Sequence, residues 1–223
     1  MKKSILILAQ ILIFSQLIGK TVPAPPTTLA WSLKKSENGV SVYSRSAENS
    51  KYNELKVVFQ VKTSLSSLVA LLNDVESYPK WIYHCESSKL LKKDSDKHLF
   101  RYQKIATPWP VDSRDMAVEV NSYQDEKTKI VYQKITAVPD YIPQSSDYVR
   151  IRELQGIWTL KPLKNGMVQV EYELLVNPAG SIPAWVINMA AVDGPYQTSI
   201  KMKELVMNEK YQKAIIPFVT NQN

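Results

Sequence analysis

The sequence is poor in the residues from which disulfide frameworks, phosphate-binding loops and histidine-based sites are built. Its 223 residues include one cysteine, two histidines and six glycines. The single Cys85 excludes an intramolecular disulfide framework and a zinc site with several thiolate ligands. The glycines, at positions 19, 39, 156, 166, 180 and 194, form neither a GxGxxG nor a GxxxxGK(S/T) motif, so the usual nucleotide-phosphate loops are absent.

Catalytic groups are equally scarce. His84 and His98 are too few for a metal site or a Ser-His-Asp triad. His84 and Cys85 are adjacent, so in an extended chain their side chains point to opposite faces and cannot act as a nucleophile and its base. We interpret Cys85 as a small buried hydrophobe. No pair of carboxylates stands in an apolar context that would separate their pKa values, and the sequence predicts neither an enzyme nor a cofactor.

The positive charge of the chain is spread along it. Lys and Arg number 28 against 21 Asp and Glu, for a formal charge of +7, and the lysines are interspersed with acids. No arginine-rich arm or aromatic-basic strand motif is present, so we expect no nucleic-acid partner. We interpret the charge as a solvated surface, with a patch for anionic lipid headgroups as the alternative. The length and the 44% hydrophobic content suit a globular protein of one domain, or at most two small ones.

The N-terminus has the pattern of a targeting segment. Lys2 and Lys3 precede the apolar run Ile5–Ile18, which has the length of a signal-peptide core and is shorter than the roughly 17 to 25 residues that cross a bilayer. We predict a signal peptide over residues 1–19 and a Pro-rich leader over 20–29. The protein is expected to be exported, to the periplasm in the first place and to the extracellular space as the alternative. An uncleaved amphipathic anchor is the competing interpretation.

Period-two alternation predicts a sheet. Leu55, Val57, Phe59 and Val61 alternate with mostly polar residues, and the run from Gly166 to Val176 alternates in the same way. Five further strands are expected, over Val40–Arg45, Lys97–Ala106, Arg114–Tyr123, Lys129–Ala137 and Val149–Lys161.

Helical spacing appears in two places. Ser64 is suited to start a helix whose apolar residues run from Leu65 to Leu72. In the last third, an apolar stripe from Ile182 to Ala190 predicts a second helix, which Gly194-Pro195 should kink or break before a further piece runs from about Tyr196 to Ala214. Many antiparallel strands followed by one long C-terminal helix indicate an α+β fold, with a curved sheet wrapped round that helix.

One charged residue shares a strand face with apolar ones. If the strand that begins at Arg114 is regular, Arg114 has the parity of Met116, Val118 and Val120. A buried cation must be paired, because removing its partner typically costs about 3–5 kcal/mol. The functional interpretation is a cationic anchor inside an apolar cavity. A bulge that turns the side chain to solvent, or a purely structural ion pair, is the alternative.

The aromatic content fits such a cavity as well. Five Trp and twelve Tyr accompany only four Phe, and rings with a polar edge suit amphipathic guests. Trp185 and Met189 lie on the stripe of the predicted C-terminal helix, where packing in the core and contact with a ligand are both open to them.

Two sequence motifs resemble those of one protein family. The run Thr107–Asp115 (TPWPVDSRD) resembles the proline-aromatic-proline to Arg-Asp signature of the START family, the lipid-transfer domains related to steroidogenic acute regulatory protein. Asn177–Asn188 (NPAGSIPAWVIN) resembles the family's entry into its last helix, and Trp31–Arg45 resembles its opening. The similarity covers nearly all of residues 30–214, which leaves 215–223 as a C-terminal tail.

The resemblance implies a helix-grip fold, in which the sheet encloses a tunnel for one lipid and Arg114 meets the polar head. Leu154 stands where phosphatidylcholine-binding members carry tyrosine, so phosphatidylcholine is not the ligand we expect. The residues expected at the ligand are Arg114, Trp109, Met116, Tyr102, Leu154, Trp158, Tyr172, Trp185 and Met189.

These observations support three hypotheses. The first is a non-enzymatic, monomeric carrier of a lipid or another hydrophobic molecule, with the C-terminal helix as a gate. The second is an enzyme on the same scaffold, resembling polyketide cyclases and aromatases, in which Arg114 with Tyr172 or Tyr102 would orient and protonate an intermediate. The third is a module whose lysine-bearing last helix makes transient contact with a membrane surface.

Overall fold

A computed structural model describes residues 29–221, apart from the side chains of Trp185, Met189 and Ala190. The predicted signal peptide and residues 20–28 of the leader therefore lie outside the described residues. Within the described part, no helix is long and apolar enough to cross a membrane.

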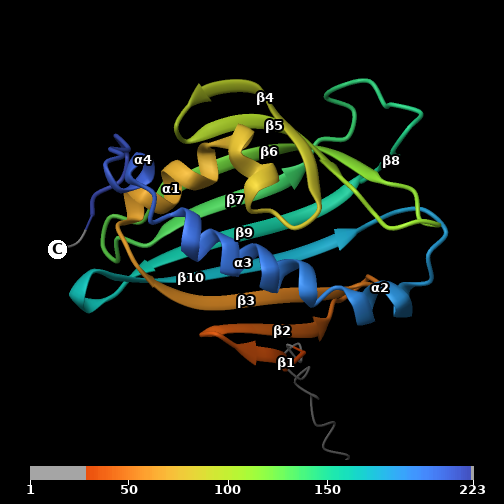
Figure 1. Cartoon of the computed structure of the whole chain (residues 1–223), viewed down its shortest axis with the longest axis horizontal. Helices are drawn as coiled ribbons and strands as arrows, with labels where there is room; N and C mark the ends of the chain where they lie inside the picture. The colour runs from red at the N-terminus through yellow and green to blue at the C-terminus, as the bar shows by residue number, and fades with distance from the viewer. Residues whose placement is uncertain (1–28, 222–223) are drawn as a thin grey trace, which may run out of the picture.

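A curved sheet of ten strands forms most of the molecule (Figure 1). Its order is β1-β2-β3-β10-β9-β7-β6-β5-β4, with all neighbours antiparallel, while the short β8 pairs with β6 in parallel. The strands are β1 (Ser32–Glu37), β2 (Val40–Ser46), β3 (Asn53–Lys62), β4 (Cys85–Ser95), β5 (His98–Ile105), β6 (Arg114–Gln124), β7 (Val131–Ala137), β8 (Val149–Arg150), β9 (Glu153–Pro162) and β10 (Met167–Asn177).

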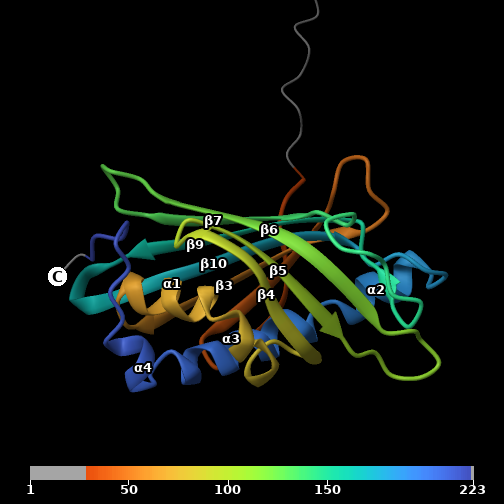
Figure 2. The same ribbon diagram turned by 90° about the horizontal axis from the view of Figure 1, so that it is seen from above.

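The helices gather on one face of this sheet. In Figure 2 the sheet arches over α1 and α3, which lie together on its concave side. This arrangement confirms the predicted α+β class and the helix-grip fold. The helices are α1 (Leu65–Asn73), α2 (Ala184–Ala190), α3 (Asp193–Leu205) and α4 (Glu209–Gln212), with 3-10 turns η1 (Val75–Lys80) and η2 (Lys164–Gly166).

The core lies between the concave face of the sheet and the two helices. Val57 and Phe59 of β3 are buried as the alternation predicts, and Val168 and Val170 of β10 are buried beside them. The apolar residues of α1 recur at helical spacing and so form one face of that helix, with Leu68, Leu71 and Leu72 buried. This face and Met202 of α3 cover the two strands. Ser64 caps α1, and its hydroxyl accepts a hydrogen bond from the amide of Ser67 at 3.0 Å.

The C-terminal helix is divided at a different place from the one predicted. The break falls between α2 and α3, at Ala191–Val192, and Gly194 and Pro195 lie in the first turn of α3. Proline is tolerated there because the first amides of a helix have no partner within it. The predicted piece from Tyr196 to Ala214 is likewise two helices, α3 and α4.

The sheet also contains strands that the alternation does not reveal. The run Val149–Lys161 is divided into β8 and β9, and β1 and β4 were not predicted at all. These two are the edges of the sheet. β4 shifts register against β5 at three places, between Cys85 and Ser87, Leu90 and Lys92, and Lys93 and Ser95, so its side chains do not keep a period of two.

Candidate functional site

A cavity of about 200 Å³ lies between the sheet and α3. Its floor comes from the middle of the sheet, one side comes from α1, η1 and the residues after η1, and α3 closes it. Most of the wall is aliphatic or aromatic, and Arg101 is the one charged residue among the described residues that line it. The strands contribute Arg101, Gln103, Ile105, Met116, Ile135, Leu154, Trp158, Tyr172 and Leu174; α1, η1 and the segment after η1 contribute Leu72, Tyr78, Trp81, Ile82 and Tyr83; α3 contributes Gly194, Pro195, Thr198 and Ser199.

A larger hollow of about 690 Å³ lies on the other face of the sheet. Its walls carry charges of both signs, and two of the pairs there are Arg45 with Glu54 at 2.6 Å and Glu173 with Lys56 at 3.0 Å. The internal cavity is therefore the better candidate for an apolar ligand.

Four of the predicted ligand residues line the internal cavity. Met116 lies on β6, Leu154 and Trp158 on β9, and Tyr172 on β10. The register of β9 and β10 places Trp158 opposite Tyr172, and the two rings stack with centroids 4.0 Å apart. Burial raises the pKa of Tyr172 to about 12, so its hydroxyl stays protonated at neutral pH.

The structure places Trp109 and Tyr102 elsewhere. Trp109 is 92% exposed at the tip of the loop between β5 and β6. Tyr102 lies on the outer face of β5, where its hydroxyl donates a hydrogen bond to Asp115 at 2.8 Å. Burial and this carboxylate both raise the pKa of Tyr102. The side chains of Trp185 and Met189 lie outside the described residues, so their predicted contact with the ligand stays a prediction.

Arg114 has the predicted parity but does not line the cavity. It begins β6 on the same face as Met116, and it is buried. Its guanidinium donates hydrogen bonds to the backbone carbonyls of Pro178 and Ala179, each at 3.2 Å, and to that of Asp112. Backbone acceptors at the end of the strand thus occupy three N–H donors of Arg114, and its predicted role as the head-group anchor stays a prediction.

Through Arg114 the two START-like motifs meet in space. One motif supplies Arg114, and the other supplies the carbonyls of the Asn177–Ser181 loop. Gly180 in this loop has a φ of +76°, and a Cβ atom there would lie 3.0 Å from Arg114 Nη2. The pair of motifs thus forms a joint between the start of β6 and the segment that leads into α2.

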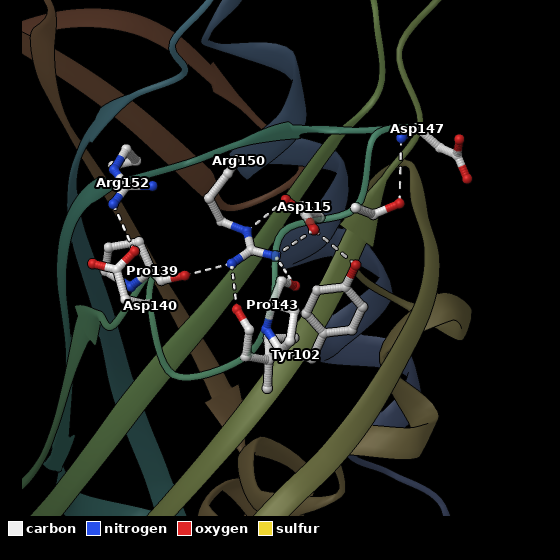
Figure 3. A network of polar contacts seen from close by, with 10 residues as sticks. Tyr102, Asp115, Pro139, Asp140, Pro143, Asp147, Arg150 and Arg152 are labelled. Carbon is white, nitrogen blue, oxygen red and sulfur yellow. Dashed lines mark hydrogen bonds and ion pairs between the residues drawn. The ribbon is translucent and has the colours of Figure 1, made fainter.

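The aspartate of the same motif is part of a second buried cluster (Figure 3). Asp115 accepts hydrogen bonds from Arg150 Nε at 2.7 Å and from Arg150 Nη2 at 2.9 Å. Arg150 also donates to the carbonyls of Pro139, Ile142 and Pro143, and so holds the long loop between β7 and β8 against β6. Burial alone would raise the pKa of Asp115, but hydrogen bonds from Arg150 and Tyr102 outweigh it and lower that pKa.

The sequence analysis missed Arg101, which lies on the inner face of β5. Leu99, Arg101 and Gln103 are buried there, while His98, Phe100 and Tyr102 point to the other face. The same parity argument that drew attention to Arg114 could have found Arg101. The signal was masked because the aromatic rings of Phe100 and Tyr102 make the outer face of β5 look as apolar as the inner one.

The comparisons with known proteins agree with this fold. A family model described as "Polyketide cyclase / dehydrase and lipid transport" matches residues 61–193, more than half of the chain. The chain belongs to this family. The resemblance to START proteins is confirmed by a crystal structure titled as a STAR-related lipid transfer protein from Xanthomonas axonopodis, with 31% identity, a TM-score of 0.75, and coverage of 80% of this chain and 99% of that one.

Two proteins similar to this chain in sequence, and one further solved structure, extend the comparison. The protein is 38% identical to uncharacterized protein PA1579 of Pseudomonas aeruginosa, over 75% of this chain and 82% of that protein. It is 25% identical to the phosphatidylcholine transfer protein of Rattus norvegicus, over 74% of this chain and 78% of that protein. The structure of human STARD10, with 21% identity, a TM-score of 0.69, and coverage of 81% of this chain and 74% of that one, shares the fold.

Proposed function

We propose that the protein binds a lipid or similar hydrophobic molecule in the internal cavity and transfers it without chemical change. The observation that carries the proposal is the apolar cavity closed by α3 in a START-like fold. Burial of an alkyl chain is favourable by about 0.8 kcal/mol for each CH₂ group, so tight binding needs no reaction. Relatives named phosphatidylcholine transfer proteins support transport as the role of the fold.

We further propose that α3 is the gate. The cavity of about 200 Å³ is smaller than the ~300–1,000 Å³ of sites for drug-sized ligands, so a lipid enters only if part of the wall moves. The N-terminal half of α3 is held by a few polar contacts. Asn38 Nδ2 donates to the Tyr196 hydroxyl at 2.8 Å, the amide of Tyr83 donates to Thr198 at 3.0 Å, and Lys35 pairs with Asp193 at 3.3 Å.

The opposite end of the C-terminal segment is fixed more firmly. Asp74, after α1, accepts hydrogen bonds from Lys210 and Tyr211, both at 2.7 Å. Gln212 donates to Thr63 at 2.7 Å, and Met202, Val206 and Tyr211 pack into the core at this end. This asymmetry supports a hinge near α4, with the Gly194-Pro195 end of α3 swinging away from the sheet.

The cyclase alternative has less support in the geometry. Its candidate acid and orienting groups were Arg114, Tyr102 and Tyr172, and only Tyr172 lines the cavity. No carboxylate is among the cavity residues in the described part of the chain. The cavity therefore offers no carboxylate as a general base to act with Tyr172. We therefore propose a carrier and not an enzyme.

The proposed setting follows from the sequence. We propose export by residues 1–19, a periplasmic destination, a monomer, and transient contact with a membrane during loading and release. The N-terminal sequence of the mature protein, together with its distribution between cell fractions, tests export and destination.

The carrier function is tested by native mass spectrometry of residues 20–223, purified from a lipid-rich host. We expect a stoichiometric adduct of lipid mass that organic solvent releases. Delipidated protein should then move fluorescent lipid between vesicles. A protein that remains free of adduct after incubation with mixed lipids would contradict the proposal.

A cavity-filling variant makes the test specific. Met116→Trp adds volume on the cavity side of β6, and Asn121→Trp adds the same ring at an exposed position of the same strand. We expect Met116→Trp to lose the adduct and the transfer activity, and Asn121→Trp to keep both. Circular dichroism and thermal unfolding check that both variants fold.

A further inference from the structure

Arg101 is a buried cation, and two of its three guanidinium nitrogens lack a hydrogen-bond partner among the described residues. Its residue is 6% exposed, and it lies in the middle of β5 with its side chain on the cavity wall. Nε and Nη1 have no hydrogen-bond acceptor among the described residues, and the same is true of Nε1 of Trp81, which is 1% exposed and also lines the cavity. Three buried donor nitrogens on residues that line one small cavity therefore lack a partner among the described residues.

The other buried arginines show how unusual this is. Arg114 donates to three backbone carbonyls, and Arg150 is paired with Asp115 and three carbonyls. All acidic side chains of the sequence lie among the residues that the structure describes, and none of them forms an ion pair with Arg101. Its guanidinium lies over the ring of Tyr78, whose centroid is 4.8 Å away.

The rest of the described wall offers no counter-ion to a positive ligand. No carboxylate is among the described residues that line the cavity, and the Tyr78 hydroxyl donates to the carbonyl of Leu72 at 2.5 Å. A guanidinium stays protonated in proteins, so a choline or amine head would share the cavity with a like charge and no counter-ion. An uncharged alcohol would leave the charge of Arg101 uncompensated, which is costly in a desolvated site.

We propose that the cavity is selective for an anionic amphiphile, of which a long-chain carboxylate is the simplest, and that Arg101 together with Trp81 Nε1 receives the anionic group. This inference rests on the proposed carrier function and names its ligand class. The forked guanidinium matches the two oxygens of a carboxylate, and the indole N–H supplies a third donor.

The test compares three ligands that have one C16 chain and different heads with a phospholipid that has two C16 chains. Delipidated full-length mature protein is titrated with palmitate, hexadecanol, hexadecyl phosphate and dipalmitoyl phosphatidylcholine, and binding is measured by native mass spectrometry and calorimetry. We expect palmitate to bind roughly 10- to 100-fold more tightly than hexadecanol, since hydrogen bonds to a charged group are stronger than neutral ones. The hexadecyl phosphate arm distinguishes a phosphate from a carboxylate as the preferred anion.

Two variants assign the preference to Arg101. Arg101→Met should abolish the preference for palmitate while hexadecanol still binds, and Arg101→Lys should retain part of it. Because Met removes an unpaired buried charge, the ligand-free Arg101→Met protein should unfold at a higher temperature than the wild type, which also shows that it folds.

The outcomes separate this inference from the function on which it rests. Equal binding of palmitate and hexadecanol by the wild type, tighter binding of phosphatidylcholine, or an unchanged preference in Arg101→Met would overturn the anionic selectivity and leave the carrier function standing. Failure of all four ligands to bind the wild type would overturn both.

Discussion

At the scale of single residues, the joint between the two START-like motifs depends on a glycine. Gly180 combines a left-handed backbone conformation with close contact to Arg114, whereas Gly166 has a similar φ of +68° and open space around it. A non-glycine residue in this region costs about 1–2 kcal/mol. The two glycines are therefore a matched pair that separates backbone strain from the contact with Arg114.

We predict that Gly180→Ala destabilises the protein more than Gly166→Ala. Both variants incur the backbone cost, but only Gly180→Ala pushes against the Arg114 guanidinium, which is held by three carbonyls and cannot easily withdraw. Urea unfolding of the two variants measures the difference. Equal losses of unfolding free energy in the two variants would mean that the Arg114 guanidinium moves aside at little cost.

The buried Asp115–Arg150 pair predicts a dependence of stability on pH. Because the pKa of Asp115 is lowered in the folded state, the pair's contribution is fully present above the ordinary aspartate pKa of about 3.9 and is lost as the pH falls toward the lowered value. Asp115→Asn should cost about 3–5 kcal/mol at pH 7, since it leaves Arg150 buried without a counter-ion, and it should unfold with a weaker dependence on pH between pH 5 and pH 3.

The measurement is the free energy of unfolding from pH 7 to pH 3. Asp147→Asn, in the exposed part of the same loop, is the control and should behave like the wild type. An Asp115→Asn protein whose stability falls as steeply in acid as that of the wild type would contradict the assignment.

The two arginines show how far sequence reasoning reaches at this scale. The alternation of β6 correctly predicted which face Arg114 occupies, but not that carbonyls from a loop more than sixty residues away bind it. The bonding partners of a side chain are set by tertiary contacts, which periodicity does not contain. Arg101 was missed because its strand has aromatic rings on its outward face, so no face of β5 stood out as apolar.

At the scale of elements, the C-terminal segment is predicted to move at one end only. Tyr196 at the start of α3 and Tyr211 in α4 each have a hydroxyl in one tertiary hydrogen bond, with Asn38 at 2.8 Å and with Asp74 at 2.7 Å. Phenylalanine at either position keeps the ring and removes that bond, whose net value is about 1 kcal/mol. The two variants thus compare the proposed gate with the proposed hinge.

We predict that Tyr196→Phe speeds ligand release roughly fivefold, because a loss of about 1 kcal/mol in the closed state favours opening by that factor. Tyr211→Phe should lower global stability by a similar free energy and leave the release rate unchanged. Stopped-flow release of a fluorescent lipid and denaturant unfolding measure the two quantities. Faster release in Tyr211→Phe alone would place the moving end at α4.

The elements themselves were predictable where the pattern is regular. The alternation of β3 and β10 and the apolar stripe of α1 were sufficient to locate these elements. The break in the C-terminal helix was displaced because Gly194-Pro195 is as acceptable in a first turn as in an interruption. β4 was missed because its bulges destroy the alternation from which a strand is inferred.

At the scale of the whole molecule, two exposed hydrophobic side chains lie in segments at opposite ends. The β5–β6 loop, which carries Trp109, lies at the α2 end of the molecule, and α4, which Ile215 follows, lies at the other (Figure 2). Their exposures are 92% and 89%. Tryptophan is favoured at membrane interfaces because its ring is apolar and its N–H is polar.

We predict that membrane contact occurs through the Trp109 end. Trp109→Ala should reduce association with lipid vesicles and slow lipid transfer severalfold, while the thermal stability stays unchanged because the ring makes little contact with the protein. Ile215→Ala, at a nearly equally exposed position, should leave both properties as they are. Co-sedimentation and transfer assays test the pair, and the opposite ranking would favour contact through the lysine-bearing C-terminal helices.

The two edges of the open sheet affect the tendency of the protein to aggregate. An unpaired edge strand is a template on which another chain can add a strand. β4 interrupts its edge with three register shifts and carries Lys89, Lys92 and Lys93, while β1 contributes Lys34 and Lys35 and a register shift of its own. In the proposed transfer cycle, the protein exposes apolar surface each time that α3 opens. Edges that reject strand addition allow it to do so repeatedly without growing into fibres.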